Sequence, residues 1–354
     1  MPPVPMAFAS GLYDRMVPLA TGEVQTKGLD LNFLEFHHPR DIFDRQAGNN
    51  EFDACELSSS EYITRYCAAN EGKPPGERDA CEFVAIPVFP SRAFRHGFIA
   101  VNSDKIKTPK DLEGKKVGVQ LYTMTAAVWQ RGILQHEYGV DIDSIEWVEG
   151  KMEGPGSHGQ PSALPVQRPV RITRNTDPAR SLSDLLAAGA IDATIGADPP
   201  ACLNKPTSPH ITRLFPDFKA VEKAYFAKTQ IFPIMHLVVL RRPFHEKHRF
   251  AASSLYEALT QSKELARKRM KYTSALHYML PWLPEAIDEI DEVFGGDCWP
   301  YGLEDEGNRR TVEALVEFLA EQGMVSWRPS VEELFAPVSL TRFRMGLNDS
   351  LPMP

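Results

Sequence analysis

The chain has 354 residues, 43% of them hydrophobic and 24% charged, and a formal net charge of −8 at pH 7. This composition is typical of a globular protein with room for two domains. Since no basic tract and no apolar run of about 18 residues occurs, we expect neither a nucleic-acid partner nor a membrane partner. The five cysteines are scattered without a CxxC pair and the first residues lack a signal-peptide pattern, so we expect a reduced, cytoplasmic protein.

The first hundred residues alternate between extended and helical patterns. Strands are predicted at 6–10 and 29–36, each followed by a helix. Residues 52–70 predict a strand, a turn and a helix, and the start of this helix carries the serines 58–60. Free N–H groups at a helix start favour an anion. The apolar segment 94–102 is predicted to be a further strand.

The middle of the chain has an alternating series of its own. A strand at 116–120 precedes a helix from Thr123 or Thr125 to about Tyr138, and either threonine is available to cap it. Residues 150–169 are rich in Pro and Gly and predict a loop. A helix, a strand and a partly helical segment follow.

The segment Ile231–Arg242 is predicted to be a buried strand with His236 in its middle. From about residue 250 to residue 333 the chain is mostly helical, with clear 3.6-residue periodicity in two segments. Alternating strands and helices indicate an α/β fold with mainly parallel sheets.

We expect two α/β domains, one discontinuous and one inserted. The first would comprise 1–103 and 231–354, with a mainly helical C-terminal part, and the second 104–230. The apolar strands 94–102 and 231–241 would be the two crossings between domains, side by side under a cleft. A ligand in such a cleft is lined by strand ends and helix starts. The segments expected to line it are Tyr13–Arg15, Ser58–Ser60, Tyr122–Thr125 and Gly196–Pro199.

Several segments together resemble one enzyme family. They include LYDR (12–15), FDACELSSSEY (52–62), IPVFPSRAFRHGFIAVN (86–102), YTMTAAVWQRGIL (122–134), IFPIMH (231–236) and WPYGLE (299–304). In this order they resemble the 4,5-dihydroxyphthalate decarboxylase family, over about residues 6–340. The resemblance implies a fold like that of a type II periplasmic binding protein, and a carboxy-lyase acting without a cofactor on a hydroxylated aromatic acid.

One position departs from the pattern of that family. Where the family has an arginine before Pro199, this chain has Asp198. A cation there would suit a substrate carboxylate, whereas Asp198 would repel one. The resemblance therefore implies an aromatic acid as the substrate, and which acid it is stays open.

Decarboxylation of this kind needs a general acid, and histidine suits the task because its pKa lies near neutral pH. A proton added to the carboxylated ring carbon lets the bond to CO2 break, with the electrons returning to the ring. His236 and His96 lie on the two expected crossing strands and are the candidate catalytic residues. A buried core position is the alternative for each of them.

Other side chains are candidates for binding the substrate. Arginine matches a carboxylate, hydroxyl groups at helix starts donate to anions, and tyrosine rings stack on an aromatic substrate. Ordinary salt bridges, helix caps and core packing are the alternatives. The candidates are Arg15, Arg92, Arg95, Ser58, Ser59, Thr123, Thr125, Tyr13, Tyr122 and Tyr301, with Asp198 as the residue that tunes specificity.

The remaining hypotheses have weaker support. Asp192, Asp198, His210 and His236 have no recognisable ligand spacing, so a divalent metal is unsupported and no cofactor is expected. A non-catalytic intracellular binding protein or sensor for a small aromatic anion is the main alternative function. A pyrimidine-precursor synthase of the thiamine pathway would need a cysteine-rich motif that is missing. The expected partner is a small aromatic acid, and a homo-oligomer stays open.

Overall fold

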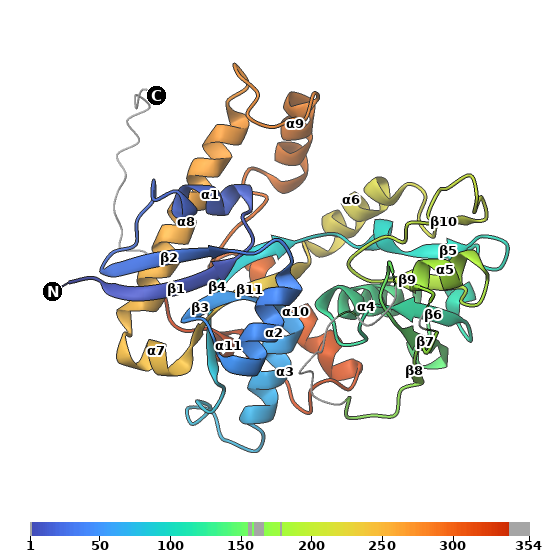
Figure 1. Cartoon of the computed structure of the whole chain (residues 1–354), viewed down its shortest axis with the longest axis horizontal. Coiled ribbons are helices and arrows are strands. Elements are labelled where there is room, and N and C mark those ends of the chain that lie inside the picture. Colours follow the sequence, from blue (N-terminus) through green and yellow to red (C-terminus); the bar gives the residue numbers. More distant parts are fainter. Residues whose placement is uncertain (1, 155–157, 159–165, 178, 340–354) are drawn as a thin grey trace.

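The computed structural model describes residues 2–154, 158, 166–177 and 179–339. Two β-sheets lie beside each other, each covered by helices (Figure 1). The expected architecture of two α/β domains is therefore confirmed. None of the described helices is long and apolar enough to span a membrane. Of the predicted loop at 150–169, residues 155–157 and 159–165 lie outside the described residues, and the described ones form neither helix nor strand.

The first sheet has the strand order β2-β1-β3-β11-β4. Its strands are β1 (Val4–Ser10), β2 (Leu29–Glu35), β3 (Ala54–Ser58), β4 (Phe83–Arg92) and β11 (Ile234–Arg241). β1 runs parallel to both β2 and β3, while β11 lies antiparallel between β3 and β4. The carboxyl ends of β1 and β3 and the start of β11 therefore meet at one edge.

The second sheet has the strand order β10-β5-β9-β6-β7-β8. Its strands are β5 (Ala100–Asn102), β6 (Lys116–Val119), β7 (Glu146–Glu149), β8 (Ile172–Arg174), β9 (Ala193–Ile195) and β10 (Ile211–Arg213). β9, β6, β7 and β8 are parallel, β5 lies antiparallel to β9, and β10 lies antiparallel to β5. Both sheets are thus mixed, with a parallel part in each.

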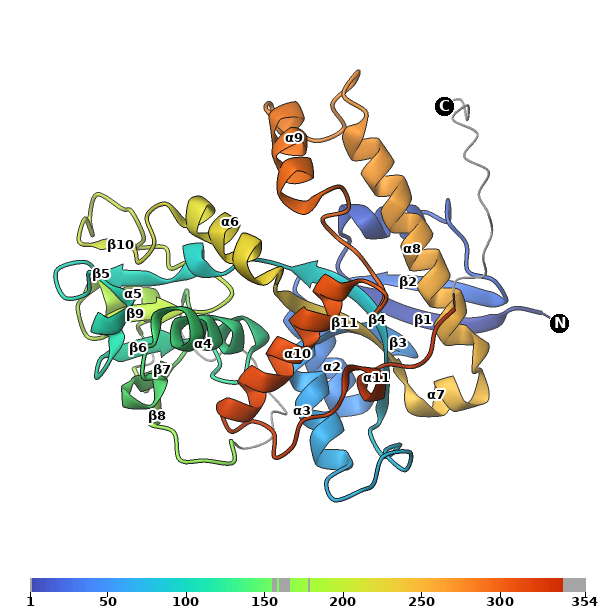
Figure 2. The ribbon, with the colours of Figure 1, turned by 180° about the vertical axis from the view of Figure 1, so that it is seen from behind.

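Helices surround both sheets (Figures 1 and 2). The α-helices are α1 (Val17–Ala20), α2 (Pro39–Asn49), α3 (Ser59–Ala69), α4 (Thr125–Tyr138), α5 (Leu182–Ala187), α6 (Phe218–Thr229), α7 (Arg242–Lys247), α8 (Phe250–Lys271), α9 (Leu283–Phe294), α10 (Glu306–Glu321) and α11 (Val331–Leu334). The 3-10 helices are η1 (Asp14–Met16), η2 (His96–Phe98), η3 (Pro109–Leu112) and η4 (Ile142–Ser144). The helical C-terminal part expected from the sequence is confirmed.

The start of α4 differs from the prediction. The helix begins at Thr125, but its N-cap is Met124, which makes no side-chain capping hydrogen bond. The expected capping by Thr123 or Thr125 is therefore wrong. The Thr125 hydroxyl instead contacts the hydroxyl of Ser58, from the other domain, at 2.9 Å. At its far end α4 stops at Gly139, whose φ of 64° suits a residue without a side chain.

The crossing between domains also differs from the prediction. Residues 94–102 do not form one strand beside β11, because the chain leaves the first sheet after Arg92 and turns through η2 before it enters the second sheet as β5. A Cβ atom on Gly97 would lie 2.7 Å from the Phe218 ring, so only glycine fits this tight turn against α6. The strands that pair with β11 are β3 and β4. The prediction of a strand over Ile231–Arg242 is confirmed by β11.

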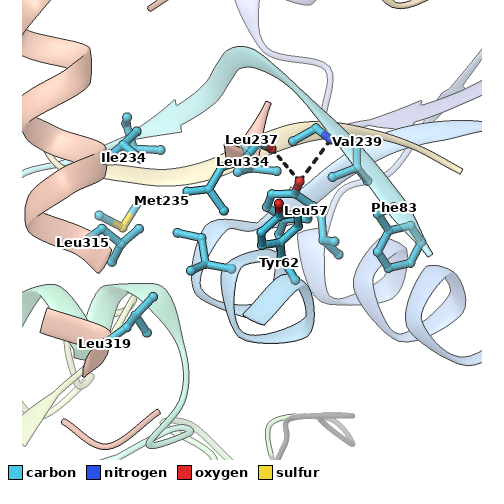
Figure 3. Close-up of a cluster of buried hydrophobic side chains, with 14 of the residues drawn as sticks. Leu57, Tyr62, Phe83, Ile234, Met235, Leu237, Val239, Leu315, Leu319 and Leu334 are labelled. Carbon is cyan, nitrogen blue, oxygen red and sulfur yellow. Dashed lines mark hydrogen bonds between the residues drawn. The ribbon is translucent and has the colours of Figure 1, made fainter. Parts of the chain in front are cut away.

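The largest hydrophobic cluster joins the two domains. Met235, Leu237 and Val239 of β11 point into it, opposite Tyr62 of α3 and the leucines of α10 (Figure 3). The Tyr62 hydroxyl donates a 2.5 Å hydrogen bond to the Leu334 carbonyl, which satisfies this polar atom inside the cluster. Trp129 of α4, fully buried in the same cluster, brings the second domain onto this core. The two domains are thus held by packing as well as by the two crossings.

Candidate functional site

A cavity of about 360 Å³ lies between the two domains, at the edge where β1 and β3 end and β11 and α4 begin. This is the place where α/β sheets usually bind ligands, and the volume suits a small molecule. The lining residues come from both domains. They are Tyr13, His38, Pro39, Arg40, Phe43, Ser58, Glu61, Thr64, Ser91, Arg95, Leu121, Thr123, Met124, Thr125, Ala126, His158, Ala197, Asp198, Met235, His236 and Met324.

His236 lines this cavity and is held from behind by a carboxylate. Its Nδ1 atom lies 2.5 Å from Oε1 of Glu56, and the ring of Phe43 meets its imidazole edge-on, with the ring centroids 5.0 Å apart. The side-chain hydrogen bond of His236 to the described residues is made by Nδ1 and not by Nε2. Because Nδ1 is occupied by Glu56, Nε2 is the nitrogen left to exchange a proton with a ligand.

Glu56 is completely buried and accepts hydrogen bonds from four groups. Besides His236, they are the Tyr13 hydroxyl at 2.6 Å, the Ser10 hydroxyl at 3.0 Å and the Gly11 N–H at 3.1 Å. Burial alone would raise the pKa of Glu56. The hydrogen bond and charge of His236, with the donors of Tyr13 and Gly11, outweigh it and lower this pKa. Glu56 is therefore a buried carboxylate that stays ionised.

The alternation of β3 and β11 explains how these two side chains meet. Cys55 and Leu57 of β3 enter the large interdomain cluster, so Glu56 between them faces the other side of the sheet. In the pairing of β11 with β3, His236 lies opposite Ser58 and Val238 lies opposite Glu56. His236 and Glu56 are thus diagonal neighbours on one face.

Our sequence analysis missed Glu56. The available signal was a carboxylate in the middle of a short strand, ACELS, whose other residues are apolar or small. Such a charge is too costly to bury without partners and so indicates a function. We also missed the contribution of α2, which brings Arg40 and Phe43 to the cavity. Arg40 is paired with Asp44 through Nε at 2.7 Å and lies 3.9 Å from Glu61.

Arg95 is the buried cation of the cavity. It is 8% exposed, and its guanidinium donates to the Ala197 carbonyl at 2.9 Å and contacts the Met235 sulfur at 3.3 Å. Burial lowers the pKa of Arg95 to about 10, although the charges of Asp198 and Glu222 act in the opposite direction. The guanidinium therefore stays charged at neutral pH. Among the described residues, no carboxylate lies within 4 Å of it, so it can bind an anion.

The hydroxyl groups of the cavity bond to one another across the domain boundary. Ser58 contacts Thr125 as described above, and Thr125 also accepts from the Ser60 N–H at 3.0 Å. The Ser60 hydroxyl donates to the Thr123 carbonyl at 2.8 Å. Ser58, Thr123 and Thr125 line the cavity. These hydrogen bonds thus link the start of α3 to the start of α4.

Asp198 lies at the exposed rim of the cavity. Its carboxylate accepts a hydrogen bond of 3.0 Å from the side-chain amide of Gln120. The same amide nitrogen lies 3.1 Å from Nδ1 of His158, and burial lowers the pKa of this histidine. Asp198 therefore adds a negative charge to the rim, in line with the sequence.

His96 lies outside the cavity. It is 1% exposed and packs between the rings of Phe215 and Tyr225, with centroid distances of 5.5 and 5.4 Å. Neither ring nitrogen has a hydrogen-bonding partner among the described residues, and burial lowers the pKa of His96 to about 4. The turn at η2 carries this side chain into the second domain. This position argues against His96 as the acid.

Arg15, Arg92, Ser59, Tyr122 and Tyr301 do not line the cavity. Arg15 donates to the Pro90 carbonyl at 2.8 Å, and Arg92 donates to the carbonyls of Phe232 and Pro300 at 3.2 and 3.1 Å. Tyr122 packs under the guanidinium of a buried arginine, Arg131. The hydroxyls of Ser59 and Tyr301 are buried without a hydrogen-bonding partner in the described part of the chain.

The described residues contain no group of three or more His, Cys, Asp or Glu side chains that could hold a metal ion. The candidate site consists of the His236–Glu56 pair, the buried Arg95 and several hydroxyl groups. This set can transfer a proton and bind an anion.

Comparison with known proteins gives the family. No family model matches the chain. The 4,5-dihydroxyphthalate decarboxylase of Comamonas testosteroni is 36% identical over 341 residues, which cover 96% of this chain and 98% of that protein. The chain belongs to the 4,5-dihydroxyphthalate decarboxylase family. Another 4,5-dihydroxyphthalate decarboxylase, from Pseudomonas putida, is 36% identical over 214 residues, 60% of this chain and 77% of that protein.

Membership of the 4,5-dihydroxyphthalate decarboxylase family confirms the resemblance found in the sequence and makes the chain a decarboxylase, that is, a carboxy-lyase. Among solved structures, the alkanesulfonate-binding protein SsuA from Xanthomonas axonopodis pv. citri is similar, with 12% identity, coverage of 96% of this chain and 100% of that chain, and a TM-score of 0.49. The aliphatic sulphonate binding protein SsuA from Escherichia coli has 12% identity, 94% and 97% coverage, and a TM-score of 0.48.

Proposed function

We propose that this chain removes CO2 from a hydroxylated aromatic carboxylic acid without oxidation, and that His236 donates the proton to the ring. The observation that supports the proposal best is the position of His236. Its imidazole lines the interdomain cavity, and its Nδ1 is engaged by buried Glu56, so Nε2 is the nitrogen available to a substrate. The two related decarboxylases supply the substrate class.

The chemistry proceeds in two steps. A hydroxyl group ortho or para to the carboxylate makes the carboxylated ring carbon electron-rich, and this carbon takes the proton from Nε2 of His236. The bond between that carbon and the carboxylate then breaks, its electron pair restores the aromatic ring, and CO2 leaves. His236 recovers its proton from water, so the net reaction consumes one proton.

The other cavity residues bind and orient the acid. Arg95 is the cation for the carboxylate, because it is charged and buried and has no carboxylate partner within 4 Å among the described residues. Phe43 and Met235 give apolar surface for the ring, and Tyr13 adds an aromatic wall. Since protonation and C–C cleavage need no electron carrier, we propose that no cofactor takes part.

The test is a screen of hydroxybenzoic and hydroxyphthalic acids with purified protein, dialysed against EDTA, and mass spectrometry of the products. We expect loss of CO2 from at least one acid at an undiminished rate after dialysis. In D2O the product should carry one deuterium on the carbon that lost its carboxylate. Tight binding of these acids without any product over hours would contradict the proposal and favour a binding protein instead.

A further inference from the structure

The side chain of Glu56 does not line the cavity, but it binds the imidazole of His236, which does. We propose that Glu56 is the positioning residue of the acid: its ionised carboxylate fixes the orientation and tautomer of His236 and stabilises the protonated imidazole. This inference rests on the proposed function, because it presupposes that His236 donates a proton to the substrate.

Glu56 is fully buried in a β-strand. Burial of a carboxylate costs several kcal/mol unless hydrogen-bond donors surround it, so its presence here indicates a functional role. Four donors converge on Glu56: Ser10 at the end of β1, Gly11 and Tyr13 in the segment between β1 and η1, and His236 of β11. No arginine or lysine forms a salt bridge with it in the described structure. His236 is thus the only cation that this carboxylate can meet there.

One oxygen of Glu56 accepts two hydrogen bonds, and this arrangement couples the carboxylate to the imidazole. Oε1 accepts from both His236 and the Tyr13 hydroxyl, at 2.5 and 2.6 Å, while Oε2 accepts from Ser10 and Gly11. The backbone N–H of Gly11 fixes the carboxylate plane, and the carboxylate in turn fixes the imidazole. An imidazole whose Nδ1–H is donated in this way must present Nε2 to the cavity. Rotation of the ring would break this bond and leave Glu56 with an unpaired charge.

Other titratable groups near the Glu56–His236 pair would not account for a changed pH dependence in a Glu56 variant. Tyr13 and Cys55 are the nearest, and burial raises the pKa of both, so neither ionises near neutral pH. The cavity also contains Arg95, Arg40, Glu61 and Asp198 and the histidines 38 and 158. A substitution at Glu56 leaves all of these in place. A change in the pH dependence of the rate can therefore be assigned to the Glu56–His236 pair.

The experiment compares Glu56→Gln and Glu56→Asp with the wild type. Glutamine has the same shape without the charge, so kcat should fall about 10- to 100-fold with KM changed less than about 3-fold. The alkaline limb of the rate profile should move to lower pH, because the protonated imidazole loses its counter-charge. Aspartate keeps the charge, so Glu56→Asp should have a rate and an alkaline limb between those of Glu56→Gln and the wild type. An unchanged rate profile in Glu56→Gln would overturn the inference.

Two further measurements separate this inference from the proposed function. If His236→Asn turns over normally, the proposed acid is wrong; if that variant is inactive while Glu56→Gln keeps the wild-type profile, only the role of Glu56 is wrong. Nitrogen-15 NMR of wild-type histidines reads the tautomer without any variant that must fold. We expect neutral His236 to carry its proton on Nδ1, and a proton on Nε2 would overturn the inference.

Discussion

The Ser58 hydroxyl lies 2.9 Å from the Thr125 hydroxyl, so a serine at the end of β3 and a threonine at the start of α4 hydrogen-bond across the domain boundary. Both side chains are buried, with 8% and 4% of their surface exposed, and both line the cavity. The backbone N–H of Ser60 donates to the same threonine. This small network fixes one domain on the other beside His236.

The hydrogen bond between Ser58 and Thr125 is predicted to stabilise the contact between the two domains. Ser58→Ala and Thr125→Ala should each lower the free energy of unfolding by about 1–2 kcal/mol, because each leaves buried polar groups without partners. In a double-mutant cycle the two changes should couple by about 1 kcal/mol, since they remove one hydrogen bond between them. Urea unfolding measures both values.

A threonine elsewhere provides the control for this cycle. The Thr229 hydroxyl donates to the Tyr225 carbonyl inside α6 at 2.8 Å and accepts from the Ile231 N–H at 3.1 Å, and neither partner belongs to the network of Ser58 and Thr125. Thr229→Ala should show no coupling with Ser58→Ala. If Ser58 and Thr125 proved just as independent, the hydrogen bond between domains would make no contribution.

Arg95 is predicted to bind the substrate carboxylate. Arg95→Met should raise KM about 10- to 100-fold, as expected for the loss of a charge-assisted hydrogen bond of about 1.5–3 kcal/mol. Arg92→Met provides the contrast, because Arg92 is equally buried but does not line the cavity. Initial rates and thermal unfolding should show a higher KM for Arg95→Met and a lower Tm, with KM kept, for Arg92→Met. A higher KM for Arg92→Met and an unchanged KM for Arg95→Met would show that the substrate carboxylate binds at Arg92 instead.

Asp198 is predicted to select against doubly charged acids. Asp198→Asn removes a negative charge at the rim but keeps an oxygen that can accept from Gln120. At an exposed position this change is worth about 1 kcal/mol for a dianion and less for a monoanion, so affinity for hydroxyphthalates should rise about 5-fold at low salt. Titration calorimetry checks it, with Asp104→Asn, which lies outside the cavity, as control. Equal effects of both variants would refute the role of Asp198.

His96 is predicted to make the fold sensitive to acid. Its pKa is lowered by burial to about 4 in the folded protein, although the charge of Glu137 opposes the shift and Glu222 lies 3.8 Å away. Between the unfolded value, near 6.5, and about 4, only the unfolded chain takes up this proton. The stability contributed by neutral His96 is therefore complete above about pH 6.5 and is lost as the pH falls, by up to about 3 kcal/mol.

Urea unfolding at pH 7.5 and pH 5 tests this sign. The difference in free energy between the two pH values should be clearly smaller in His96→Gln than in the wild type. His277→Gln, at an exposed position, should keep the wild-type difference. Parallel pH dependence of wild type and His96→Gln would show that His96 does not drive the loss.

The sequence predicted the features that follow from local patterns. The alternation of strands and helices gave the two α/β domains, and the apolar run at 231–242 gave β11 with its histidine. The turn at η2 could not be predicted in this way, because it packs Gly97 closely against Phe218, a residue more than a hundred positions away in the sequence. That turn carries His96 into a core, whereas the pairing of β11 with β3 brings His236 to the cavity.

The partner of His236 was hidden for a similar reason. Glu56 lies 180 residues before His236, and only the pairing of β3 with β11 brings the two side chains together. The local pattern shows a carboxylate between apolar or small residues of a short strand, but it does not show that His236 is its partner. The guanidinium of Arg15 illustrates the opposite case, since a charged group in a promising motif is satisfied by the carbonyl of Pro90.

The most direct test of the central proposal is the initial rate of CO2 release by His236→Asn, measured beside wild type and His37→Asn on an acid that the wild type decarboxylates. Asparagine cannot donate a proton of suitable acidity, so we predict a rate at least about 100-fold below wild type. Affinity for the acid should be preserved, and the exposed His37→Asn variant should keep the wild-type rate. A His236→Asn enzyme that releases CO2 within a few-fold of the wild-type rate would contradict the assignment of His236 as the proton donor.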